Sequence, residues 1–162
     1  MNTVIGGLAA LLYLLAGGWL TMRLARAGGG GCWPKGGPLT LGWGAALLHA
    51  MILAHTVFQP AGLNLGFFTA LSFTAWLINV VLLAAAMVRP VENLGIIILP
   101  FGAMTVLLGR LFPTERIVAD PDQWPLELHI LIAILAYSLF SLAAAQALLL
   151  AVQDYRLRHR RP

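Results

Sequence analysis

Five long apolar stretches constrain this chain more than any other feature. They cover residues 3–20, 39–58, 67–88, 94–112 and 126–152. A helix that crosses the hydrocarbon core of a bilayer needs about 20 apolar residues, so each stretch is long enough to cross once. Backbone in lipid finds no water to bond with, and such segments therefore cross as helices that satisfy their own polar groups. The sequence predicts an all-α transmembrane bundle with five spans.

The composition agrees with a membrane protein. Hydrophobic residues make up 60% of the 162 residues and charged residues only 10%, with a mean hydropathy of +0.86. A soluble domain carries about 25% charged residues, so this chain has too few charges to cover a surface that faces water. It also has too many apolar residues for a disordered chain. We expect one transmembrane domain over residues 1–162 in contact with membrane lipid, with a basic cytoplasmic tail at 153–162.

Proline and glycine separate the apolar stretches. Both residues end helices, proline through its missing N–H donor and glycine through its backbone freedom. The four-glycine run at 28–31 is not followed by the lysine and hydroxyl residue of a phosphate-binding loop, so we interpret it as a flexible connector. The breaks lie at residues 28–31 with 34–38, at 59–62, at 89–90 and at 113–125.

Basic residues gather on one side of the predicted membrane. Arg110 and Arg116 fall on the other side, which also holds most of the acids. Cytoplasmic loops carry the excess of Lys and Arg, so we place the amino terminus outside and the carboxyl terminus in the cytoplasm. Short basic loops of this kind determine topology, and we expect no binding of nucleic acid. The eight residues of the basic side are Arg23, Arg26, Lys35, Arg89, Arg156, Arg158, Arg160 and Arg161.

The first span is predicted to be retained. A signal peptide carries its basic residues before the apolar stretch, whereas Arg23 and Arg26 follow it here. Cys32 is the only cysteine, so the chain cannot form an internal disulfide, and it has no C-x-x-C-H haem-attachment motif. No span holds paired carboxylates, and neither G-x-S-x-G nor H-E-x-x-H occurs. We therefore do not expect an enzyme.

Histidines inside the spans are the first candidates for function, because ionisable groups in a bilayer are costly and need partners. At about 100° per residue, His49 lies on the same side of the second span as Gly42 and Ala46, where small residues allow a neighbouring helix to approach. His49 should therefore face the bundle, either as a bonded structural group or as a ligand or proton carrier. His55 points to the opposite side, near the headgroups.

The fifth span opens with Trp124 and carries His129 about one turn inside its outer end. His129 shares a helix face with Phe140 and four alanines, at positions 133, 136, 143 and 147, and this face leaves room for either a neighbouring helix or a flat ligand. A neutral imidazole is a suitable axial ligand for haem iron. Trp124 can stack on such a ligand or anchor the helix at the interface.

Ser72, Trp76 and Asn79 share one face of the third span, where hydrogen bonds between helices are the expected role.

The stretch Trp124-Pro125-Leu126-Glu127-Leu128-His129, followed by Leu135-Ala136-Tyr137-Ser138, resembles a segment of the cytochrome c assembly proteins in which a tryptophan and a histidine open a membrane helix. Leu48-His49-Ala50, Leu63-Asn64-Leu65 and Gln153-Asp154-Tyr155-Arg156 are similar to the YpjD-like branch of the CcsA-like proteins. The resemblance runs from about Leu39 to Arg158.

This resemblance implies haem handling during c-type cytochrome assembly at the bacterial inner membrane. His129 matches the first outer histidine, an axial haem ligand in the better-understood branches. His49 matches a second-span histidine of the YpjD-like branch. Members of the family generally carry further helices with a second outer histidine, so we expect a longer chain or a partner to complete the site. Other biogenesis components or an apocytochrome are the implied protein partners.

Our leading hypothesis is an inner-membrane, haem-binding assembly protein in which His129 coordinates iron, Trp124 flanks the porphyrin and His49 is an inner polar or ligating group. The alternative is a cofactor-free structural or accessory subunit, in which the histidines bond across helices. A small transporter ranks last, because no pair of short, broken helices marks a substrate site at the membrane midplane.

Overall fold

Five helices make up almost all of the protein in its computed structural model, which describes residues 2–27, 36–119 and 123–158. They are α1 (Asn2–Ala27), α2 (Gly36–Val57), α3 (Phe67–Val88), α4 (Gly95–Leu111) and α5 (Trp124–Arg158), and a short 3-10 helix, Glu92–Leu94, precedes α4. Each of the five long helices contains or lies within a segment long and apolar enough to cross a membrane. The all-α class and the five predicted spans are confirmed.

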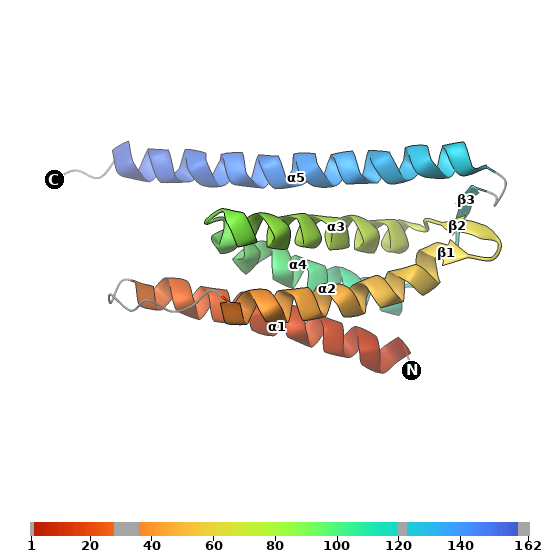
Figure 1. The fold of residues 1–162 in the computed structure, drawn as a ribbon, viewed down its shortest axis with the longest axis horizontal. Helices are drawn as coiled ribbons and strands as arrows, with labels where there is room; N and C mark the ends of the chain where they lie inside the picture. The colour runs from red at the N-terminus through yellow and green to blue at the C-terminus, as the bar shows by residue number, and fades with distance from the viewer. Residues whose placement is uncertain (1, 28–35, 120–122, 159–162) are drawn as a thin grey trace.

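The helices run side by side in alternating directions (Figure 1). α1 packs chiefly against α2 and α4, and α3 packs against both of those helices, so α1–α4 form a four-helix bundle. α5 lies along α3 and extends beyond the bundle toward the carboxyl terminus. We call the end that holds the amino terminus and the strands the sheet end, and the other end the tail end.

A small antiparallel sheet closes the sheet end. β1 (Phe58–Gln59) and β2 (Gly62–Asn64) form a hairpin between α2 and α3, and β3 (Ile117–Ala119) adds to β2 from the loop before α5. Phe58 pairs with Leu63, and Asn64 pairs with Ile117. Gly62 has a φ of 120°, which an L side chain rarely adopts, so it suits the hairpin turn. The sequence predicts only helix breaks here, and the sheet is an addition to the predicted fold.

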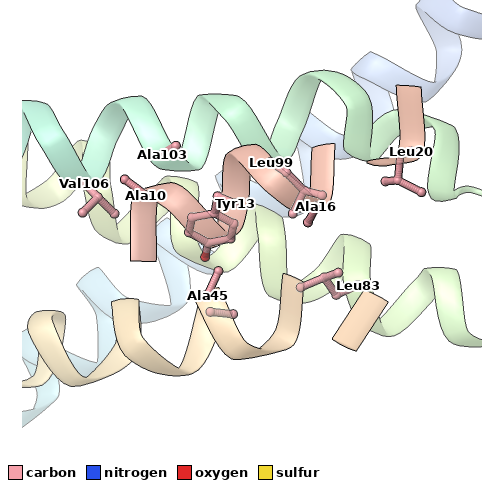
Figure 2. Packing of buried hydrophobic residues seen from close by; sticks show 10 residues of the cluster. Ala10, Tyr13, Ala16, Leu20, Ala45, Leu83, Leu99, Ala103 and Val106 are labelled. Carbon is pink, nitrogen blue, oxygen red and sulfur yellow. The ribbon is translucent and has the colours of Figure 1, made fainter. Parts of the chain in front are cut away.

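The core lies between α1, α2, α3 and α4. Tyr13 points from α1 toward α2 beside Ala45, and Leu99, Ala103 and Val106 of α4 cover the other side of α1 (Figure 2). Several core residues are alanines, which let helices approach closely where lipid gives no hydrophobic force between them. Gly102 serves the same purpose, since a Cβ there would lie 2.5 Å from the amide nitrogen of Asn79.

The helix bounds differ from the predicted spans at α1 and α5. α1 continues past Leu20 to Ala27, and α5 begins at Trp124 and continues past Val152 to Arg158. The predicted spans follow apolar stretches, whereas a helix can continue with polar residues once it leaves the hydrocarbon. The predicted connector Gly28–Gly31, Cys32 and the last residues of the basic tail, 159–162, lie outside the described residues.

Candidate functional site

His49 is fully buried and joins three helices. Its Nε2 lies 2.9 Å from Oγ of Ser72 on α3, and its Nδ1 lies 3.4 Å from the hydroxyl oxygen of Tyr13 on α1. The Tyr13 and His49 rings meet edge to face, with centroids 6.0 Å apart. The prediction that His49 faces the bundle is confirmed. The small-residue stripe explains why, since Gly42 and Ala46, on the same side of α2, are also buried.

The buried phenol favours one direction for these hydrogen bonds, although the geometry alone admits either tautomer of His49. Tyr13 is fully buried, and a phenolic hydrogen without an acceptor in such a site is costly. When Tyr13 donates to Nδ1, the neutral imidazole carries its hydrogen on Nε2 and donates to Ser72. The hydroxyl hydrogen of Ser72 is then directed away from His49. The three side chains form a chain of donors that begins on α1 and ends on α3.

This donor chain ends at a cavity of about 230 Å³ between α2, α3 and α4. Its polar side chains are His49, Thr56, Thr69, Ser72 and Arg110, and of the described residues in the lining only Arg110 carries a formal charge. The remaining lining residues are Ile52, Leu53, Val106, Gly109 and Pro113. Arg110 and Pro113 belong to the last turn of α4 and the loop after it, so the cavity lies toward the sheet end.

The predicted polar face of α3 bonds mostly within the bundle. Ser72 contacts His49, and the indole Nε1 of Trp76 donates to the carbonyl oxygen of Ala46 on α2 over 2.9 Å. Asn79 is buried and donates to Ala75 of its own helix, while its Oδ1 has no hydrogen-bond partner among the described residues. Two of the three side chains therefore join helices, which agrees with the predicted role of this face.

Asn64 ties together three segments at the sheet end. Its Oδ1 accepts hydrogen bonds from the backbone N–H of Arg116 at 2.8 Å and of Gly66 at 3.3 Å, and its Nδ2 donates to the carbonyl oxygen of Thr56 at 3.1 Å. Gly66 has no room for a side chain, because a Cβ would overlap the backbone of Thr114. One amide thus connects α2, the hairpin and the loop before α5.

His129 lies apart from this cavity. It is exposed on α5, and Trp124 at the start of the helix is 67% exposed. α5 meets α3 through another face, which includes Ile130, Ile134 and Leu142. The predicted face of His129 and Phe140 remains largely uncovered, with Phe140 73% exposed. The structure therefore does not bring His129 and His49 to one site.

The other histidines are separate from the cavity. His55 is exposed near the sheet end of α2, as predicted, and it does not line the cavity. His159 lies outside the described residues. Within the described ranges, no group of three or more His, Cys, Asp or Glu residues is placed to hold a metal ion.

A family model, described as cytochrome C assembly protein, matches residues 40–161. The chain belongs to this family. The match covers α2–α5, including His49, Ser72, Trp124 and His129, and it does not resolve the YpjD-like branch. No curated protein and no solved structure matches the chain.

The family's association with haem can be tested against both histidine sites. The cavity beside His49 is smaller than the roughly 300 Å³ at which pockets for small organic ligands begin, and both His49 nitrogens face hydroxyl groups. The His49 site therefore does not fit a porphyrin. His129 is an exposed imidazole on an uncovered helix face, so its chemistry fits one axial ligand of a flat group.

Sequence reasoning missed two members of the cavity site. Tyr13 lies in a span that is otherwise almost entirely apolar. Its position, two turns before Leu20, does not indicate that it contacts a residue of α2. Arg110 was counted only as a topology charge. A signal for Arg110 did exist, since it lies inside the predicted fourth span, residues 94–112, where a charged side chain needs a partner.

Proposed function

We propose that this protein handles haem on the outer side of the bacterial inner membrane during c-type cytochrome assembly. Membership of the cytochrome c assembly family carries the proposal. The positive-inside distribution supports an arrangement with the sheet end outside and the tail end in the cytoplasm. His129 and Trp124 then lie at the outer end of α5, accessible from outside the bundle.

In this proposal His129 supplies one axial nitrogen to haem iron, and Trp124 flanks the porphyrin. The exposure of both side chains supports these roles, because a flat ligand needs an open surface beside the imidazole. A further helix of a longer chain, an apocytochrome or another biogenesis component would provide the second ligand. His49 acts as an inner polar group that holds α1, α2 and α3 together, and the protein has no catalytic cycle of its own.

An absorbance spectrum tests the haem proposal. The purified protein is titrated with haem in detergent, and spectra are recorded in the oxidised and the dithionite-reduced states. We expect a shifted Soret band that His129→Ala removes. The matched control is His55→Ala, because His55 is also exposed toward the sheet end but lies on α2. Haem binding that survives His129→Ala would contradict the assignment, and so would binding that is lost equally in His55→Ala.

A cofactor-free accessory subunit is the second candidate function. One observation favours it, namely that His49 already bonds across helices to Ser72 and Tyr13. A subunit of this kind should bind no haem, and His129→Asn should leave its association with other membrane proteins unchanged. A Soret shift in the unaltered protein that His129→Ala removes would exclude the cofactor-free subunit.

A further inference from the structure

The cavity between α2, α3 and α4 has polar side chains in its lining, and helix packing alone does not require them there. Within the described part of the chain, Ser72 makes one side-chain hydrogen bond, which it shares with His49. With Tyr13 donating to His49 and His49 donating to Ser72, the serine hydroxyl hydrogen needs an acceptor of its own. Ser72 lines the cavity, so this acceptor can lie inside it.

The charge of the cavity lining indicates which kind of group accepts the hydrogen bond from Ser72. Arg110 lines the same cavity, and among the described residues that line it there is no aspartate or glutamate. A guanidinium carries five N–H donors and can therefore hold more than one partner at a time. Thr69 adds a hydroxyl, whereas Thr56 already donates to the carbonyl oxygen of Ile52 on its own helix at 3.0 Å. The site thus offers a fixed positive charge and a directed hydroxyl donor.

We propose that this cavity is a binding site for small anions of the carboxylate type, which enter from the sheet end. Arg110 supplies the charge, and the Tyr13–His49–Ser72 chain supplies a preorganised donor. The volume of about 230 Å³ admits a small carboxylate with some water, but not a porphyrin ring. The carboxylate can belong to a free small acid or to an arm of a larger molecule. The site does not depend on haem ligation by His129.

Cysteine accessibility tests the proposal in the full chain reconstituted into vesicles. Gly109→Cys, in a Cys32→Ser background, places a thiol at the cavity wall. A Cβ at Gly109 meets only ordinary contacts, with Phe68 O at 3.7 Å and Ser72 Cβ at 3.9 Å, so the variant should fold. We expect an anionic methanethiosulfonate to react faster than a cationic reagent of equal size by about tenfold, because a cleft of one sign concentrates its counterions.

The matched control is Gly44→Cys, which also has room for a side chain, 3.8 Å from Leu12, but does not line the cavity. It should show no preference for the anionic reagent. Arg110→Gln should abolish the preference at Gly109→Cys, and acetate should slow the labelling there in the protein that retains Arg110. Equal rates for both reagents, or no protection by acetate, would overturn the proposal.

Two further arms identify the donor and the source of the carboxylate. Ser72→Ala should weaken protection by acetate severalfold while leaving the charge preference intact. Metal-free protoporphyrin, whose carboxylates stand on flexible arms, is then compared with acetate. Protection by acetate alone indicates a free small acid, and protection by both indicates a carboxylate arm. Since metal-free protoporphyrin has no iron, His129→Ala should change neither result, so failure of haem binding leaves this test intact.

Discussion

The bundle α1–α4 and the helix α5 are equally suited in length and apolarity to a membrane, but they differ in how much of their surface is buried against other helices. In the segment Glu92–Leu111, 44% of an apolar window of 18 residues is buried inside the protein. In the segment Trp124–Tyr155, only 6% of the corresponding window is buried. The bundle buries small residues and bonded polar side chains, among them His49, Asn79 and Thr105. α5 is apolar around most of its circumference and meets α3 along one face. Apolarity thus inserts a helix, whereas small and polar residues decide which helices pack.

Gly102→Leu should have the largest effect on this contrast. Its Cβ alone would lie 2.5 Å from Asn79 Nδ2, so a leucine must push α4 away from α1 and α3. Overpacking of this kind costs about 3 kcal/mol. Thermal unfolding in detergent measures the loss. Ala147→Leu on exposed α5 is the control and should change the midpoint little. Equal losses in both variants would show that α5 is packed as closely as the bundle.

Asn64→Ala should come next, because it removes three hydrogen bonds that connect two regions of the molecule. We expect a loss of about 2 kcal/mol and a loosened loop between α4 and α5. Trypsin cleavage after Arg116 reports on that loop and should become faster. Gln59→Ala is the control, since Gln59 makes one weaker bond, of 3.4 Å, to the Thr56 carbonyl. Unchanged cleavage would mean that the strands hold the loop without Asn64.

His49→Leu should have a smaller effect, of about 1 kcal/mol, because hydrogen bonds between membrane helices contribute about 0.6 kcal/mol each on average. The variant removes the bonds to Tyr13 and Ser72 and keeps most of the volume. Its unfolding is compared with that of His55→Leu, at an exposed position that should be neutral. A loss in His55→Leu as large as in His49→Leu would contradict the structural role of the buried histidine.

Ser138→Ala should have the smallest effect, below about 0.5 kcal/mol. The Ser138 hydroxyl donates mainly to Ile134 of its own helix, at 2.7 Å, and reaches the Thr74 carbonyl on α3 only at 3.5 Å. Crosslinking between cysteines on α3 and α5 would detect a loosened contact between these two helices better than the midpoint of thermal unfolding does. A large drop in crosslinking would show that the hydroxyl holds α5 to the bundle.

The sequence predicts the parts of this fold that follow from apolar length. The α3 bounds coincide with the predicted stretch 67–88, because Gly66 and Arg89-Pro90 flank it directly. The sheet was not predicted, since strands of two or three residues carry no alternating pattern. At the candidate sites, the burial of His49 follows from the glycine and alanine on its side of α2. Its partners Tyr13 and Ser72 come from distant spans, and one sequence cannot indicate which spans are neighbours.

The α1–α4 contact also determines the order in which the bundle can be completed. The ring of Pro100 on α4 packs against Gly17 of α1, where a Cβ would lie 3.1 Å from the ring carbons. The surfaces of α1 and α4 are therefore complementary at this point. On the order of 80 residues separate the end of α1 from the end of α4. At about 5–20 residues per second, a ribosome needs on the order of ten seconds to supply them. During that interval the face of α1 that carries Gly17 has no contact with α4. The insertion machinery or lipid must cover this face until α4 is inserted.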